Sequence, residues 1–207
     1  MKKLFLLVVA IAITTIVSQA QEVRIGAKGG VNFATFSGDD LGDVKSRTGF
    51  HIGGLVEIPV SEKFAIQPEV LYSSQGSKYS DKGTELGVDY SYNVEQKLDY
   101  IQVPVMAKFY AIDGLSLEVG PQVSFLTSSK LDYEGTLGGV TVSGEEDLDD
   151  VSSIDFSIGA GASYRLPMGL FFTARYNFGL GNVNDAADAD DRKIQNRVAQ
   201  LSVGYSF

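Results

Sequence analysis

The chain has 207 residues, of which 44% are apolar and 21% charged, and its formal net charge is −9. An acidic chain of this kind argues against nucleic-acid binding, and the lack of cysteine excludes a disulfide framework, a thiolate metal site and a thiol nucleophile. With a single histidine there is little room for histidine-rich zinc chemistry, and we expect no cofactor.

The N-terminus has the pattern of a secretory signal peptide. Two lysines precede an apolar run over residues 4–17, and the small residues Ser18 and Ala20 occupy the −3 and −1 positions of a cleavage site. A membrane anchor is the alternative, but a spanning helix needs about 20 apolar residues. We therefore expect a signal peptide over residues 1–20 and a single mature domain over residues 21–207.

The mature chain alternates apolar and polar residues with a period of two, which is typical of β-strands. Leu117 and Val119 share one face of such a segment, for example, while Glu118 and Gly120 share the other. The alternation predicts eight strands, over residues 22–37, 47–60, 63–77, 94–110, 115–130, 152–166, 169–182 and 193–207.

The connections between these segments alternate in length. Three are short, and the one at Asp113-Gly114 is a strong hairpin signal. The other four are long and acidic, around residues 39–43, 81–93, 132–150 and 184–191. Short turns on one side, long loops on the other and an even strand count are typical of a transmembrane up-and-down barrel.

A soluble barrel also alternates, but its apolar residues point inward. Here the polar face consists of small side chains and many glycines, as the interior of a narrow barrel requires. Aromatic residues also gather at both ends of the predicted strands, as two membrane interfaces favour. The expected girdles are Phe64, Phe109, Tyr110, Tyr164, Phe171, Phe172, Tyr205 and Phe207 near the short turns, and Phe33, Phe50, Tyr72, Tyr100, Phe125, Phe156, Tyr176 and Phe178 near the long loops.

The same alternation predicts that charged side chains lie inside the barrel. Buried charges persist only when they are paired and hydrogen-bonded, so a nearly balanced set favours a plugged interior. Arg24 and Arg165 either join this set or lie solvated at the short-turn rim. The expected structural interior polar network consists of Lys28, Glu57, Glu69, Lys108, Glu118, Asp155 and Arg175.

Three prolines fit the predicted strands badly. Pro68, Pro104 and Pro121 each remove one donor from a strand ladder, and a closed barrel has no free edge to accommodate the loss. We expect bulges or breaks in the pairing at these positions.

The order of the glycine and aromatic segments carries a family resemblance. Residues 22–207 are similar to the outer-membrane β-barrel domain family, often labelled porin-family or PorT-like, whose barrels are of OmpA or OmpX size. The resemblance implies an all-β, eight-stranded antiparallel transmembrane barrel in the cell outer membrane, and the closing Phe207 resembles the signal that such proteins present to the outer-membrane assembly machinery. The segments that carry it include GAKGGVNFATFSG, AIQPEVLYSSQG, LDYIQVPVMAKFY, LEVGPQVSF, DFSIGAGASYRLPMGLFFTARYNFGLGNV and NRVAQLSVGYSF.

We expect a non-enzymatic protein with a structural or surface-interaction role, in contact with lipid and lipopolysaccharide, whose long acidic loops form the contact surface. A narrow small-solute channel is the first alternative. A lipid A-modifying enzyme is the second, and it would have to use His51 with Ser46 or Ser73, which form no recognisable motif. The aspartates of the loops match no EF-hand spacing, so we predict solvated acidic loops and no metal site in the chain. The alternative is that these loops share divalent cations with the phosphates of lipopolysaccharide. The loop residues most suited to recognition are Tyr79, Tyr90, Tyr92 and Tyr133.

Overall fold

The computed structural model describes residues 23–38, 44–85, 87–148, 151–183 and 194–207. The predicted signal peptide and the acidic segments 39–43 and 184–191 lie outside the described residues. Among the residues described, no helix has the length and apolar character needed to span a membrane.

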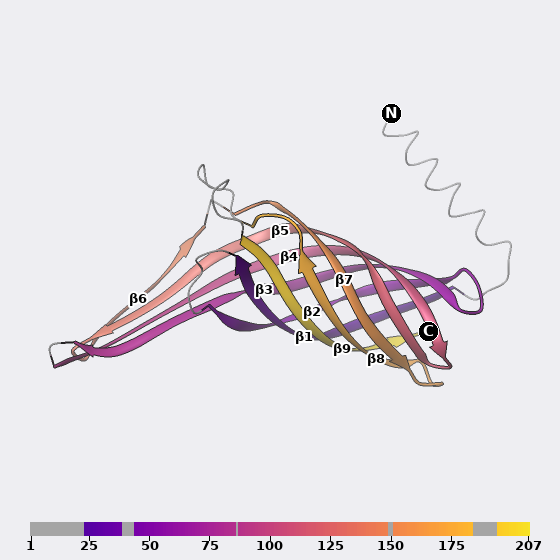
Figure 1. Ribbon diagram of the computed structural model, residues 1–207, viewed down its shortest axis with the longest axis horizontal. Coiled ribbons are helices and arrows are strands. Elements are labelled where there is room, and N and C mark those ends of the chain that lie inside the picture. Colours follow the sequence, from indigo (N-terminus) through magenta and orange to yellow (C-terminus); the bar gives the residue numbers. More distant parts are fainter. Residues whose placement is uncertain (1–22, 39–43, 86, 149–150, 184–193) are drawn as a thin grey trace, which may run out of the picture.

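The described chain forms nine antiparallel strands (Figure 1). Eight of them close a ring in the order β1-β2-β3-β4-β5-β7-β8-β9, in which β9 pairs with β1, while β6 pairs with β5 outside the ring. This confirms the predicted all-β, eight-stranded antiparallel barrel, with one strand added. The strands are β1 (Arg24–Gly38), β2 (Lys45–Pro59), β3 (Phe64–Glu85), β4 (Val88–Ile112), β5 (Leu115–Leu137), β6 (Val140–Asp147), β7 (Ile154–Arg165), β8 (Leu170–Gly179) and β9 (Ile194–Ser206).

The alternation of the sequence becomes the two faces of the barrel wall. On β5, Leu117 is 53% exposed on the outer surface, whereas the adjacent Glu118 is 3% exposed and faces the interior. Ile158 on β7 and Leu201 on β9 also lie on the outside. The predicted direction is therefore confirmed, because the apolar side chains form the outer surface of the wall.

Three aromatic residues that we expected in the girdles face the interior instead, namely Tyr100, Phe171 and, at the short-turn mouth, Tyr110. Tyr100 is fully buried, and Phe171 is buried while its neighbour Phe172 lies outside. The ring of Phe171 covers Gly204, which lies opposite it on β9. A Cβ atom at Gly204 would lie 2.2 Å from this ring, so the glycine makes room for an inward-facing aromatic side chain.

The three prolines break the strand ladders without changing their register. Pro104 keeps its partner Gln122 on β5, whereas the β3–β4 ladder stops at Leu71–Gln102 and resumes at the Pro68–Val105 pair in the same register. Pro68 lies at a similar gap in the ladder between β2 and β3, and Pro121 lies at one in the ladder between β4 and β5. A residue in a ladder directs its N–H toward one neighbouring strand, so each proline interrupts only one of its two ladders.

Strands β3, β4 and β5 continue past the barrel. We define the projecting sheet as residues 78–85, 88–99, 126–137 and β6; Figure 1 shows it extending away from the end of the barrel where the C-terminus lies. The ladder between β2 and β3 ends at Lys45–Lys78, so among the described residues the outer edges of β3 and β6 in this sheet have no strand partner.

The prediction of loops over residues 81–93 and 132–150 is wrong for most of these positions. There β3 pairs with β4 as far as Glu85–Val88, and β5 pairs with β6 as far as Leu137–Val140. A sheet with water on both faces needs no apolar face, so its polar and acidic composition does not give the strand signal that a membrane wall gives.

Candidate functional site

The centre of the barrel holds a buried ionic cluster. Arg175 on β8 donates from Nη2 to Glu69 Oε1 at 2.7 Å and from Nε to Glu118 Oε1 at 2.6 Å. Lys28 Nζ lies 2.7 Å from Glu69 Oε2. None of these four side chains is more than 1% exposed, and each charge has an opposite charge in hydrogen-bond contact, as a buried ion requires.

A second cluster surrounds Glu57 near the short turns. Its Oε1 accepts a hydrogen bond from Arg24 at 2.7 Å, and its Oε2 accepts one from Lys108 at 2.7 Å. Arg165 lies 3.7 Å from the same carboxylate. The side chains of Arg24 and Arg165 are 31% and 26% exposed, so they lie at the rim and pair with Glu57 as well.

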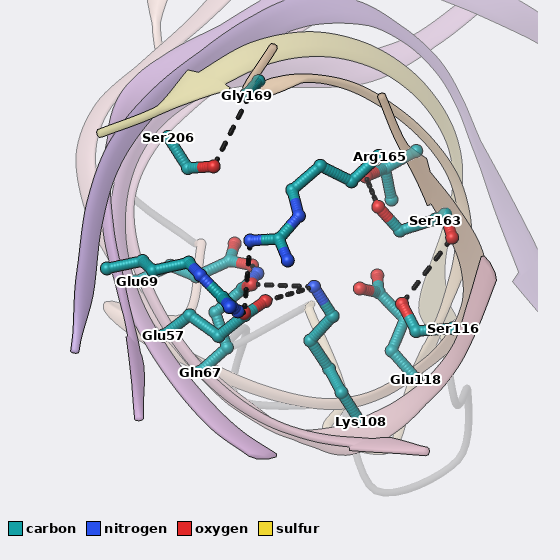
Figure 2. A network of polar contacts seen from close by, with 12 residues as sticks. Glu57, Gln67, Glu69, Lys108, Ser116, Glu118, Ser163, Arg165, Gly169 and Ser206 are labelled. Carbon is teal, nitrogen blue, oxygen red and sulfur yellow. Dashed lines mark hydrogen bonds and ion pairs between the residues drawn. The ribbon is translucent and has the colours of Figure 1, made fainter. Parts of the chain in front are cut away.

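Gln67 connects the two clusters. Its Oε1 accepts a hydrogen bond from Lys108 Nζ at 3.0 Å, and its Nε2 donates to Glu69 Oε1 at 2.7 Å. Figure 2 shows Glu57, Lys108 and Arg165 turned toward one another inside the ring of strands. The result is one continuous chain of polar contacts from the short-turn rim to the middle of the barrel.

The structure brings together six of the seven expected interior charges and leaves Asp155 apart. Asp155 is buried on β7, opposite Ser124 and six residues along β5 from Glu118. Six residues of strand correspond to roughly 20 Å. Alternation predicts whether a residue faces the inside or the outside of the barrel. It does not predict the height of that residue along the barrel axis relative to residues on other strands.

The single histidine has partners that the sequence did not indicate. His51 Nε2 lies 2.7 Å from Ser202 Oγ, and His51 Nδ1 lies 2.8 Å from Asn32 Oδ1. Gly30 lies opposite both His51 and Ser202 in the ladders, and its lack of a side chain lets them meet. Ser73, one of the two serines that the enzyme alternative would pair with His51, accepts a hydrogen bond from Asn32 Nδ2 at 2.9 Å.

A serine, a histidine and an amide in this order match the parts of an activated nucleophile. Here Asn32, His51 and Ser202 are 0%, 1% and 8% exposed. None of them lines the cavity at the short turns, the groove of the projecting sheet or the small interior pocket beside Gln102, Gln122 and Asp155. A nucleophile needs space beside it for the reacting atom, so this trio is suited to holding β1, β2 and β9 together.

The end of the barrel at the short turns is open. A cavity of about 1080 Å³ lies there, lined by the short turns together with Arg24, Arg165 and Tyr110. Tyr110, which we expected in the outer girdle, therefore lines the mouth. The cavity stops at the Glu57 cluster, where the adjoining pocket has a volume of about 10 Å³.

The projecting sheet carries a shallow groove of about 610 Å³. Lys78 and Arg47 both bind Glu95 in this region, at 2.9 and 2.8 Å. Partial burial acts to raise the pKa of Glu95, but the hydrogen bonds and charges of Lys78 and Arg47 outweigh it and hold this pKa below its usual range. The lining also includes Lys45, Tyr79, Tyr133 and Glu145.

The far tip of the projecting sheet is apolar and exposed. The two hairpins meet there, since Gly138 N donates to Asp89 O at 3.0 Å. Of the expected contact tyrosines, Tyr79 and Tyr92 are exposed, while the other two cover glycines on neighbouring strands. The exposed apolar residues of the tip are Val88, Leu137, Val140 and Val142, with exposed fractions of 41%, 63%, 68% and 64%.

Residues 18–185 match the family model of the outer membrane protein beta-barrel domain, and a search of curated proteins gives no match. Among solved structures, the attachment invasion locus protein Ail of Yersinia pestis is 13% identical, with 90% of this chain and 100% of that chain covered and a TM-score of 0.47. Neisserial surface protein A is 16% identical over 89% and 95% of the two chains, with a TM-score of 0.41. OprG from Pseudomonas aeruginosa is 12% identical over 89% and 95%, also with a TM-score of 0.41.

Proposed function

Because the chain belongs to the outer membrane protein β-barrel domain family and lies in the outer membrane, we propose that it is a non-enzymatic surface protein that binds a partner through the projecting sheet. The observation that carries this proposal is the continuation of β3, β4 and β5 past the barrel, with an apolar tip and with outer edges that have no strand partner among the described residues. Such an extension adds nothing to the wall that spans the bilayer.

The edges of the projecting sheet indicate the kind of partner. A free strand edge presents unpaired N–H and C=O groups, and an extended segment of another protein can pair with it. Residues 78–84, 88–99 and 126–147 contain four lysines and nine acidic residues. Complementary charge directs encounter and register, so we propose that the partner offers a basic, extended segment to β6.

Photo-cross-linking from single cysteines tests this role. The chain has no native cysteine, so a photo-reactive group on Val142→Cys reports contacts of the tip only. Met168→Cys, in an exposed short turn on the opposite side, is the matched control. We expect Val142→Cys to form cross-linked adducts with a partner, and an excess of this protein without the photo-reactive group to suppress them. We expect no adducts from the control. Equal labelling of the two variants would contradict the proposal.

The barrel interior supports a plugged pore over the narrow solute channel. The contacts of Arg175 on β8 with Glu69 on β3 and Glu118 on β5 cross the lumen. We expect no stable conductance in planar bilayers, and steps of porin size would favour the channel. We also propose that the outer wall of the barrel contacts lipopolysaccharide, and that the outer-membrane assembly machinery inserts the barrel.

The burial of the serine–histidine–asparagine trio supports the proposal that the protein is not an enzyme. A lipid A-modifying activity would need the hydroxyl of Ser202 to reach a lipid, and that side chain faces the barrel interior. We expect His51→Ala to leave lipid A composition unchanged in cells that express the protein. A change in lipid A that depends on His51 would favour the enzyme.

A further inference from the structure

A small polar chamber lies inside the barrel between the central ionic cluster and the projecting sheet. Its volume is about 10 Å³, which is room for one water molecule or one ion. Toward the projecting sheet, β4 continues from Gln102 to Tyr100 and Leu98, which form an apolar cluster with Val151 and Val183. The chamber is lined by Gln75, Gln102, Gln122, Asp155, Ser157, Asn177, Gly179, Asn196 and Val198.

Three amide groups of this chamber, those of Gln102, Gln122 and Asn196, donate from their nitrogens and leave their oxygens without partners, whereas Asn177 has neither its nitrogen nor its oxygen paired among the described residues. Gln102 and Gln122 both donate from Nε2 to Ser124 Oγ, at 3.4 and 3.3 Å. Asn196 donates from Nδ2 to Gln75. The remaining oxygen of each of the three donors is buried and accepts no hydrogen bond within the described chain. Buried acceptors rarely remain unsatisfied in this way.

Asp155 adds an unpaired negative charge to the same chamber. Its residue is 5% exposed, and its Oδ1 atom has no partner among the described residues. The other buried carboxylates, Glu57, Glu69 and Glu118, each contact a lysine or arginine. A Cβ atom at Gly181 would lie only 3.0 Å from Asp155 Oδ1, so a side chain at this position would crowd the carboxylate.

We propose that the chamber binds one hard cation, held by the carboxylate of Asp155 and by the amide oxygens of Gln102 and Gln122. A buried carboxylate is stable when it is paired or coordinates a metal. Unpaired oxygens on Ser157, Asn177 and Asn196 complete a set of six, the lower limit of the six to eight that calcium takes.

The donor atoms restrict the identity of the ion. Oxygen ligands without thiolate or imidazole suit hard cations and disfavour zinc and copper. Magnesium keeps several of its water molecules, and the chamber has no room for them. Sodium and calcium share the required chemistry, and the single carboxylate matches the charge of sodium.

The ion would join strands that no ion pair between described residues joins at this height of the barrel. Its ligands come from β4, β5, β7, β8 and β9, and the chamber lies just below the point where the projecting sheet leaves the barrel. A cation there would fix the diameter of the ring at the base of the projecting sheet, independently of the Glu69 cluster.

Thermal unfolding in detergent micelles tests the proposal. After treatment with a chelator, the protein is measured in NaCl, in CaCl2 and in choline chloride at equal ionic strength, because choline is too large for the chamber. At about 100 times the dissociation constant, we expect a small cation to raise the Tm by roughly 5–10 °C over choline. Equal Tm values in all three salts would overturn the proposal.

Two variants separate the chamber from general salt effects. Asp155→Asn should lose the response to cations, and in choline it should be no less stable than the original protein, because it removes an unpaired buried charge. Asp113→Asn is the control, since Asp113 lies in an exposed turn and Asn-Gly is an equally good hairpin turn. A cation response that persists in Asp155→Asn would contradict the assignment.

Anomalous diffraction from crystals of the unsubstituted protein gives an answer even if Asp155→Asn fails to fold. Crystals soaked in thallium acetate report a sodium-like site, and crystals soaked in CaCl2 report a calcium site. We expect a peak among Asp155, Gln102 and Gln122 in one of the two soaks. Density without anomalous signal in both, at hydrogen-bond distances from these oxygens, would show an ordered water instead.

Discussion

Strands β3, β4 and β5 run through two environments, and the same kind of ion pair differs between them. Inside the barrel, Arg175 and Glu69 are 1% and 0% exposed, and each depends on the other for its charge to be tolerated. In the projecting sheet, Lys130 and Glu145 are 41% and 51% exposed, and water can replace either partner. The comparison shows that the environment, more than the contact distance, determines how much a charge pair contributes.

Removal of Arg175 should have the largest effect. Arg175→Ala leaves Glu69 without one of its two cationic partners and Glu118 without its arginine, both deep in the interior. We expect the free energy of unfolding to fall by about 3–5 kcal/mol, measured by urea unfolding in lipid vesicles.

Lys130→Ala provides the matched control in the projecting sheet. The hydrogen bond to Glu145 raises the pKa of Lys130, but this side chain is open to solvent, and we expect no measurable change in barrel unfolding. Similar losses from Lys130→Ala and Arg175→Ala would break the comparison between the two regions.

A charge placed on the outer wall should have the next largest effect. Leu201 is 53% exposed at mid-strand of β9, where we expect it to face acyl chains. Leu201→Lys should cost about 2–4 kcal/mol if the residue lies at the bilayer midplane. Val142→Lys, at an even more exposed apolar site in the projecting sheet, should leave vesicle unfolding unchanged.

The sequence predicts the wall well because the bilayer imposes a strict rule on it. The outward position of Leu117, Ile158 and Leu201 can be predicted from the alternation of period two, once the environment of the wall is taken to be lipid. The same alternation places Tyr100 and Phe171 on the inner face. The expectation that aromatic residues form outer girdles is therefore wrong where it conflicts with alternation.

The interior contacts could be predicted only in part. Alternation alone places His51, Asn32 and Ser202 inside, but their meeting depends on the register across Gly30. Asp155 faces the interior, as the ionic network requires, but it lies too far along the barrel axis to reach that network. The projecting sheet was not predictable from the same pattern, because a strand with water on both faces has no apolar side to reveal it.

The smallest expected effect is a pH response of the projecting sheet. The folded-state pKa of Glu95 lies below its ordinary value of 4.5, so its stabilising contribution is present above that pH and is lost as the pH falls through the folded-state pKa. Because the pair is partly exposed, we expect about 0.5 kcal/mol.

Hydrogen exchange along β3 and β4 measures this response. Amides near the Lys78–Glu95 pair should exchange faster on acidification, after correction for the intrinsic pH dependence, while those of the barrel should not. Glu95→Gln should make the projecting sheet insensitive to pH in this range. An unchanged pH response in that variant would assign the effect to other carboxylates.

Lipid-dependent quenching tests the central claim most directly, namely that apolar side chains of the wall face acyl chains while the projecting sheet stands in water. A fluorophore is attached to single cysteines at Leu117 and at Val142, which have similar exposure, 53% and 64%, in a chain without native cysteine. In vesicles with brominated acyl chains, the account predicts strong quenching at Leu117→Cys and none at Val142→Cys. Quenching at Val142→Cys with none at Leu117→Cys would contradict it.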